Sequence, residues 1–263
     1  MSKCEFCKKT LHTNNFYNID NDFCLCVDCY RNLGDKFHTY SFKPCPVFKG
    51  IKDRKKHLHV GIELEIQTNK FKYFILFLHL FRNKNIYLKR DGSLNEYGIE
   101  FVSMPMTFSY IINNTFEMLF EKFREYNFNN TDNCGLHFHL DKEYLNQMDI
   151  AKIDYMVNNW CSQLSSIGGR EYVNSRYCRV LYKNIDKYGI DTEGSRYVAC
   201  NLTNRDTVEL RFCKSTSDYY TFIKRVSLIF SLVDIAKQYT YKQLMESDNP
   251  YDILAHAMRK YMR

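Results

Sequence analysis

Three short segments of the chain place polar side chains at alternate positions, a spacing that can bring them to one site. The pairs are Glu63 and Glu65 in HVGIELEI, His137 and His139 in CGLHFHL, and Glu209 and Arg211 in TVELRF. Each segment is typical of a β-strand, in which residues i and i+2 point to the same face. A further acid, Glu100, occurs in GIEFVS. Together these residues predict one sheet face lined with metal-binding acids and a phosphate-binding arginine.

Acids gathered on one face require a compensating positive charge. Two carboxylates about 4 Å apart repel by about 4 kcal/mol at an effective dielectric constant of about 20. Such a cluster needs cations between the acids, or raised pKa values. Oxygen ligands favour Mg²⁺ or Mn²⁺, and His137 or His139 can add an imidazole ligand. We therefore expect a divalent-metal site formed by Glu63, Glu65, Glu100 and Glu209.

Basic residues near these acids in the sequence can bind the phosphates that complete a Mg²⁺ coordination shell. They are Lys89, Arg90, Arg196 and Arg211. Arginine binds phosphate through two parallel hydrogen bonds. Acids, metal and arginines together are typical of a phosphoryl-transfer site.

Each motif alone has a simpler explanation. An E-x-E pair on a strand is most often a solvated face, H-x-H is commonly a zinc site or a pair of edge residues, and E-x-R is often an ion pair worth little. A glycine, however, lies two residues before three of the ligands: Gly61 before Glu63, Gly98 before Glu100, and Gly135 before His137. A glycine at that spacing shares the strand face and would leave room for a metal, a phosphate or a substrate.

The first 29 residues contain five of the eleven cysteines. Cys4-x2-Cys7 and Cys26-x2-Cys29 are separated by 18 residues, which predicts a structural zinc site with four thiolates. Cys24 can replace one of the four or be a free thiol beside the site. Two disulfides in a secreted protein are the alternative, and the expected compartment argues against them. Zinc would supply the free energy that this weakly apolar segment lacks.

The succession of elements predicts an α+β domain with a largely antiparallel sheet. We expect a zinc-binding module over residues 1–45, a linker over 46–56 and a catalytic domain over 57–263. Strands are predicted at 57–66, 85–89, 98–104, 134–140, 196–201 and 207–213. Helices are predicted at 69–82, 107–126, 149–167, 218–238 and 249–261.

The net charge of +7 is compatible with an anionic substrate such as a nucleotide but is too weak to indicate nucleic acid. The longest apolar run, residues 71–81, contains Lys72 and His79 and is far shorter than the roughly 20 residues that span a bilayer. No signal peptide is recognisable. We therefore expect a cytoplasmic protein without a membrane partner, and we disfavour nucleic acid as a partner.

Five motifs in order resemble the amidoligase family, which belongs to the glutamine synthetase and glutamate–cysteine ligase superfamily of carboxylate–amine ligases. They are HVGIELE, KRDGSL followed by GIEFVS, CGLHFHL, RYVACNL and TVELRF, and they cover about residues 57–240. The resemblance implies an antiparallel sheet, packed by helices, whose concave face holds Mg²⁺ and ATP. It implies that the metal ligands are Glu63, Glu65, Glu100 and Glu209.

The resemblance also implies roles for the other polar residues. Arg196 and Arg211 would neutralise the γ-phosphate during its transfer. Either His137 or His139 would approach the metal or the phosphates, and the sequence does not decide which. Asn201 would contact the substrate or the nucleotide.

A charged turn near the acceptor site is implied for Lys89, Arg90 and Asp91, and residues 170–195 are a candidate substrate loop. The expected activity is ATP- and Mg²⁺-dependent amide-bond formation through an acyl phosphate. One alternative is a non-catalytic protein- or nucleic-acid-binding module that retains the fold and uses the zinc segment as its contact surface. A metal-dependent hydrolase with Glu and His ligands is a third hypothesis. The acid, the amine and the oligomeric state are left open.

Overall fold

Strands in which apolar and polar residues alternate form a sheet across the middle of the protein. The computed structural model describes residues 2–12, 16–20, 23–114, 116–171, 175, 178–180 and 197–262. Within these ranges seven strands form one sheet, in the order β3-β5-β6-β4-β7-β9-β8. They are β3 (Phe37–His38), β4 (Val60–Gln67), β5 (Ile86–Lys89), β6 (Gly98–Ser103), β7 (Gly135–Asp141), β8 (Cys200–Asn201) and β9 (Thr207–Lys214). Neighbouring strands are antiparallel except for β3 and β5, so the predicted α+β class with a mostly antiparallel sheet is confirmed.

The five predicted helices are found near their expected positions, but two of them are each divided, and two further short helices were not predicted. The described helices are α1 (Val27–Gly34), α2 (Phe71–Leu80), α3 (Phe108–Asn114), α4 (Glu117–Glu125), α5 (Gln147–Asn159), α6 (Cys161–Gly168), α7 (Tyr219–Gln238), α8 (Tyr241–Met245) and α9 (Pro250–Met258). The prediction for 149–167 missed a break at Trp160, whose ψ of 37° turns the chain between α5 and α6. The prediction for 107–126 spans both α3 and α4.

The apolar residues of the strands form the core on one face of the sheet. Ile62, Leu64 and Ile66 alternate along β4 and are fully buried. On β6, the ring of Phe101 packs edge-on against Phe77 of α2, with the ring centroids 5.4 Å apart. It also packs against α4. Because this face is covered by helices, the residues between these positions point to the opposite face, which carries the polar pairs.

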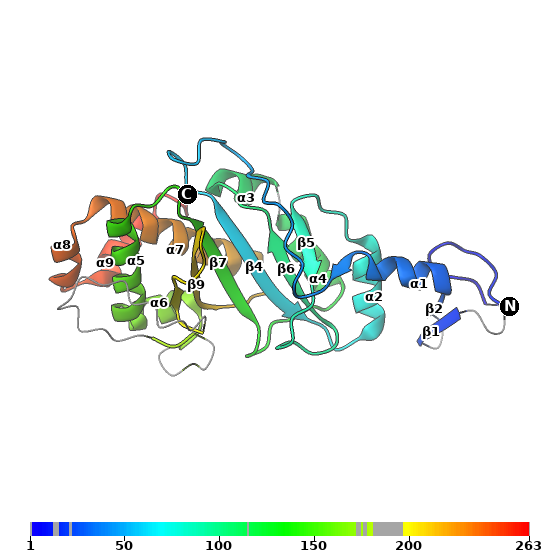
Figure 1. Cartoon of the computed structure of the whole chain (residues 1–263). Coiled ribbons are helices and arrows are strands. Elements are labelled where there is room, and N and C mark those ends of the chain that lie inside the picture. Colours follow the sequence, from blue (N-terminus) through cyan, green and yellow to red (C-terminus); the bar gives the residue numbers. More distant parts are fainter. Residues whose placement is uncertain are drawn as a thin grey trace.

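The N-terminal segment is attached to the main sheet rather than separate from it. Figure 1 shows the hairpin of β1 (Phe16–Asp20) and β2 (Phe23–Cys26) at one end of the molecule, beyond α2, with α5, α8 and α9 at the other end. Phe6 stacks on His79 of α2, with the ring centroids 3.6 Å apart. β3 pairs with β5, and the backbone N–H of Arg90 donates to the carbonyl of His38 at 3.0 Å. The predicted boundary at residue 45 therefore does not mark the start of the sheet.

The predicted linker, residues 46–56, is bound to the sheet domain at two points. The backbone N–H of Lys49 donates to the carbonyl of Pro105 at 2.9 Å. Arg54 binds both carboxylate oxygens of Asp141, each at 2.8 Å, and its guanidinium lies over the ring of Phe48. Asp141 is buried and needs such a partner. Arg54 thus fixes the predicted linker to β7 of the sheet.

Within the described parts of the chain, none of the helices has the length and apolar character needed to cross a lipid bilayer.

Candidate functional site

The strand register confirms that the alternating pairs share one face of the sheet. Glu65 on β4 is the direct partner of Glu100 on β6, and Glu100 is the partner of Lys89 on β5. One step along β4, Glu63 is the partner of His137 on β7. Directly paired residues point to the same side of a sheet. We call this side the polar face.

The next row of the polar face continues toward the other edge of the sheet. His139 on β7 pairs with Glu209 on β9, and Glu209 pairs with Asn201 on β8. Gly61 of β4 lies opposite His139. The antiparallel pairing of β8 with β9 therefore places Asn201 beside the acids.

A first cluster of metal-ligand atoms comprises Glu63, His137 and Glu209, which come from three adjacent strands. One ligand atom from each lies within 4.8 Å of the others. Glu63 Oε2 is 3.4 Å from His137 Nδ1, and Glu63 Oε1 is 3.2 Å from His139 Nε2. Both histidines thus contact Glu63, but His137 belongs to the cluster and His139 lies beside it, with its Nδ1 3.4 Å from Thr207 Oγ1.

A second cluster comprises Glu65, Asp91 and Glu100, again with ligand atoms within 4.8 Å of one another. Lys89 Nζ lies 3.0 Å from Glu100 Oε2, close enough for an ion pair. Among the described residues, the same buried oxygen has no hydrogen-bond partner, so the ion pair is its only compensation. A buried carboxylate oxygen in this condition is costly unless a proton or a cation occupies its open side. The donor set of three carboxylates suits a hard divalent cation such as Mg²⁺.

Glu209 binds one arginine and two asparagine side chains on the polar face. The Arg211 guanidinium binds its Oε1. Asn201 Nδ2 donates to its Oε2 at 2.8 Å, and Asn204 Nδ2 donates to the same oxygen at 3.2 Å. Both carboxylate oxygens of Glu209 therefore have hydrogen-bond partners, whereas Glu100 Oε2 has none in the described part of the chain.

Two of the predicted basic residues are not placed at these clusters. The exposed Arg90 lies with its guanidinium 4.8 Å from the ring centre of Phe37, whose strand partner is the core residue Leu88. Its predicted catalytic role is therefore not supported, because Arg90 directly follows Lys89 and consecutive strand residues point to opposite faces. Arg196 lies outside the described residues, as does most of the candidate loop 170–195.

Burial raises the pKa of Glu65 and of Glu100 in the second cluster. For Glu100, burial and repulsion from Glu63 raise the pKa to about 8, against the opposing attraction of Lys89. For Glu65, burial raises the pKa although His137 and the backbone N–H of Gly135 favour the charged form. This cluster therefore holds protons readily while no cation is bound.

The first cluster has the opposite tendency. Burial alone would raise the pKa of Glu63, but attraction to His139 and His137 outweighs it and holds that pKa well below its usual value. The pKa of Glu209 is also lowered, because His139 and Arg211 together outweigh burial. The carboxyl groups of this cluster therefore stay ionised at neutral pH.

The glycines that precede the ligands make room for side chains rather than for a ligand. A Cβ atom on Gly135 would lie 2.4 Å from Nε2 of His137, and one on Gly98 would lie 2.4 Å from Cβ of Leu94. At Gly61 the nearest atom, Cβ of His139, is at an ordinary 3.5 Å. The expectation of open space is therefore wrong at Gly98 and Gly135. Gly135 allows the imidazole of His137 to fold back toward Glu63.

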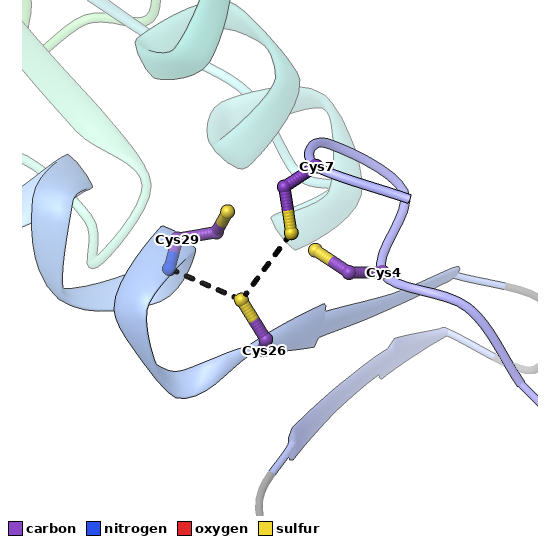
Figure 2. Close-up of side chains that lie close together, drawn as sticks. All are labelled: Cys4, Cys7, Cys26 and Cys29. Atoms are coloured by element: carbon purple, nitrogen blue, oxygen red, sulfur yellow. Dashed lines mark hydrogen bonds between the residues drawn. The ribbon is translucent and has the colours of Figure 1, made fainter. Parts of the chain in front are cut away.

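Four cysteines meet at the N-terminal end of the molecule, as the spacing predicts. Figure 2 shows Cys4 and Cys7 from one loop pointing toward Cys26 and Cys29, which lie at the start of α1. All four Sγ atoms lie within 4.8 Å of one another, and Cys7 Sγ is 3.7 Å from Cys26 Sγ. A tetrahedral zinc site with Zn–S bonds of about 2.3 Å requires sulfur–sulfur distances of about 3.8 Å. The cluster can therefore hold zinc.

The surroundings favour the thiolate at Cys4 but not at Cys29, where burial and the neighbouring thiols raise the pKa. Burial would raise the pKa of Cys4, but hydrogen bonds from the backbone of Cys26, Cys7 and Phe6 lower it to about 6. The backbone N–H of Cys29 donates to Cys26 Sγ at 3.4 Å. Cys24 is not part of the cluster, because its thiol points to Asn18 of the neighbouring strand.

Sequence reasoning missed several residues of the polar face. Asp91 was expected in a charged turn, not as a ligand beside Glu100. His38 was not expected there at all, yet its parallel pairing with Lys89 places it at the edge of the same face. Tyr87 could have been identified, because it lies two residues before Lys89 in a predicted strand.

Comparisons with protein-family models, with curated proteins and with solved structures find no match.

Proposed function

We propose that the polar face binds Mg²⁺ and ATP and that the protein is an ATP-dependent carboxylate–amine ligase of the amidoligase type. The observation that carries the proposal is the pair of acid clusters on one sheet face, bordered by Lys89 and Arg211. The order of the sequence motifs supports the same activity. The concave active face of the glutamine synthetase and glutamate–cysteine ligase type is part of this proposal.

The two clusters would hold divalent cations with different residues. Glu63, His137 and Glu209 would bind one, and the cluster of Glu65, Asp91 and Glu100 would bind another. A cation held there would supply positive charge against the phosphates, which would permit an anionic carboxylate to approach. Glu100 Oε2, which has Lys89 as an ion-pair partner but accepts no hydrogen bond from the described residues, supports this fit.

The protein's own cations would then act on the phosphates. Arg211, half-buried and already oriented by Glu209, can turn part of its guanidinium to the transferred phosphoryl group. Lys89, held beside Glu100, would contact a phosphate as a point charge. Asn201 would keep Glu209 in position through its 2.8 Å hydrogen bond.

The reaction would proceed in two steps. A carboxylate oxygen of the acid attacks the γ-phosphorus of ATP, the bond to the bridging oxygen breaks, and ADP leaves. The amine nitrogen then attacks the carbonyl carbon of the acyl phosphate, the carbon–oxygen bond to phosphate breaks, and the nitrogen loses a proton. The residues of the polar face position the reactants and stabilise charge, and the chemistry requires no nucleophilic side chain.

In this proposal the four-cysteine cluster holds a structural Zn²⁺. Zinc would fix the loop of Cys4 and Cys7 against the start of α1, and α1 leads directly into β3 of the main sheet. Stabilising the N-terminal segment would thereby stabilise the edge of the polar face.

One observation favours the alternative of a non-catalytic binding module. Lys89 pairs with Glu100 and Arg211 pairs with Glu209, so two of the four predicted glutamate ligands are compensated without metal. Glu63→Ala distinguishes the two functions. A ligase loses metal–nucleotide binding, whereas an interaction module keeps its partner.

Hydroxylamine tests the ligase directly, because it traps acyl phosphates as hydroxamates. Protein incubated with ATP, Mg²⁺, hydroxylamine and a panel of carboxylic acids should form a hydroxamate and release ADP with at least one acid. Glu209→Gln should abolish this product, whereas Glu246→Gln, at an exposed position in the C-terminal region, should not. Zinc-loaded, folded protein that binds no nucleotide at millimolar Mg²⁺ would overturn the proposal.

A further inference from the structure

We propose that four aromatic rings at the β3 edge of the polar face form the subsite for the planar base of a bound nucleotide. The inference rests on the proposed function. The rings are those of His38, Tyr40, Phe42 and Tyr87, which we call the aromatic border. Three of the four come from the N-terminal segment that the sequence assigns to the zinc module.

The sheet register places the aromatic border beside the acids. His38 pairs with Lys89, and Lys89 pairs with Glu100. Since neighbouring strands are about 4.8 Å apart, His38 lies two strands, or about 10 Å, from the second acid cluster. Tyr87 lies on the same face, two residues before Lys89. Its pKa is raised by burial and by the negative charges of Glu63 and Glu100, consistent with that position.

The rings of His38, Phe42 and Tyr87 are packed together, and all four rings are partly accessible. The imidazole of His38 stacks on the ring of Phe42, with the centroids 3.7 Å apart and the planes inclined by 11°. Phe42 meets Tyr87 edge-on, with a centroid distance of 5.5 Å. The Lys89 ammonium lies 5.1 Å from the ring centre of Tyr40, which is 49% exposed. His38, Phe42 and Tyr87 are half-buried.

The chemistry of the aromatic border favours an uncharged planar ring over a cationic ligand. A cationic group that approached the rings would be repelled by Lys89, which already lies over Tyr40. An uncharged planar ring gains stacking energy on such a surface, and the base–aromatic interaction tolerates any base. A ligand with a planar base at the border and phosphates at Lys89 and the acids is a nucleotide. The ribose would span the rows between them.

The proposal therefore assigns a functional contribution to the N-terminal segment. That segment would supply part of the nucleotide site, with β3 as the element that fixes it to the sheet. The base would lie toward β3, and the acceptor acid and amine would lie toward β8 and β9, where Asn201 and Arg211 are found.

Calorimetric titration with two probes tests this subsite. MgATP carries a base, and magnesium tripolyphosphate carries the phosphates alone. Tyr40→Ala and Phe42→Leu should weaken MgATP binding by roughly 5- to 100-fold, the usual effect of losing one stacking ring. Tripolyphosphate affinity should change by less than about twofold. Tyr251→Ala, which removes a similarly exposed tyrosine (47%) from α9, should leave both affinities unchanged.

Each outcome below supports or excludes the base subsite, provided that thermal unfolding shows that the variants are folded. If the variants lose affinity for MgATP and tripolyphosphate in parallel, or lose affinity for neither, the base subsite is wrong. If the wild-type protein binds tripolyphosphate as tightly as MgATP, the base subsite is wrong while the phosphate site stands. If the wild type binds neither probe, the proposed function fails together with the subsite.

Discussion

Glu65 on β4 and Glu100 on β6 are direct cross-strand partners, and their side chains lie on the same face, 5% and 3% exposed. Like charges at directly opposed positions destabilise a sheet. Asp91 adds a third carboxyl group within 4.8 Å, and Lys89 compensates only Glu100 directly. The fold thus retains an arrangement that lowers its stability unless a proton or a cation is bound.

Mg²⁺ should therefore stabilise the wild-type protein more than a variant with fewer acids. Glu65→Gln keeps the acceptor for the backbone N–H of Gly135 and removes one charge. Without metal, the variant should be more stable to urea by about 1 kcal/mol. Millimolar Mg²⁺ should raise the melting temperature of the wild type, and it should raise that of the variant by less. Equal gains in both proteins would show that the second cluster does not bind the ion.

The raised pKa of Glu100 predicts a specific pH dependence. Its pKa is about 8 in the folded protein and 4.5 in its ordinary state, so the folded protein binds more protons between these values. Stability contributed by this group is complete below about pH 4.5 and falls as the pH rises toward 8. Glu100→Gln should flatten that fall. Urea unfolding of both proteins at pH 5, 6.5 and 8 measures the difference, and identical slopes would contradict the assignment.

The four-cysteine cluster should hold about one zinc ion per chain. Cys26→Ser removes a thiolate from the cluster, and zinc content measured by mass spectrometry should fall close to zero. Cys24→Ser is the matched control, since Cys24 lies on the same strand but its thiol faces Asn18. Equal zinc loss in both variants would mean that the ligand set is different.

Zinc removal should also loosen β3. The backbone N–H of Arg90 donates to the carbonyl of His38, so its hydrogen exchange reports this pairing. Chelation should speed exchange at Arg90 while amides in the centre of β4 remain protected. Unchanged exchange at Arg90 would separate the zinc site from the sheet edge.

Gly135 should be essential to the first cluster, whereas Gly61 should not. Alanine at 135 would place its Cβ 2.4 Å from Nε2 of His137 and displace the imidazole, but at 61 the nearest contact is an ordinary 3.5 Å. Gly135→Ala should weaken Mn²⁺ binding at least tenfold. Gly61→Ala should bind Mn²⁺ like the wild type, as measured by electron paramagnetic resonance. If both variants bind equally well, His137 is not a ligand.

The period of two along a strand was enough to predict which side chains share a face, but not which ones meet. Glu63, Glu65 and Glu100 follow that period, and their common face was predictable. The partnership of Glu65 with Glu100 depends on the order and register of the strands, which hydrophobic alternation within one strand does not encode. The same period could have excluded Arg90, which directly follows Lys89.

The N-terminal segment shows where local reasoning fails. The cysteine spacing predicted the cluster correctly because ligand geometry is encoded locally. The pairing of His38 with Lys89 joins residues 51 positions apart, and two residues of β3 have no recognisable strand pattern. The division at Trp160 was missed because the apolar pattern of the helix continues through it.

The central claim is that the polar face binds a metal–nucleotide complex through the glutamates. Calorimetric titration of MgATP into zinc-loaded wild type, Glu63→Gln and the exposed control Glu246→Gln tests it most directly. The account predicts saturable, Mg²⁺-dependent binding by the wild type and the control, and a loss of at least tenfold in affinity for Glu63→Gln. Absence of binding to folded wild-type protein at millimolar Mg²⁺, or equal affinity in all three proteins, would contradict it.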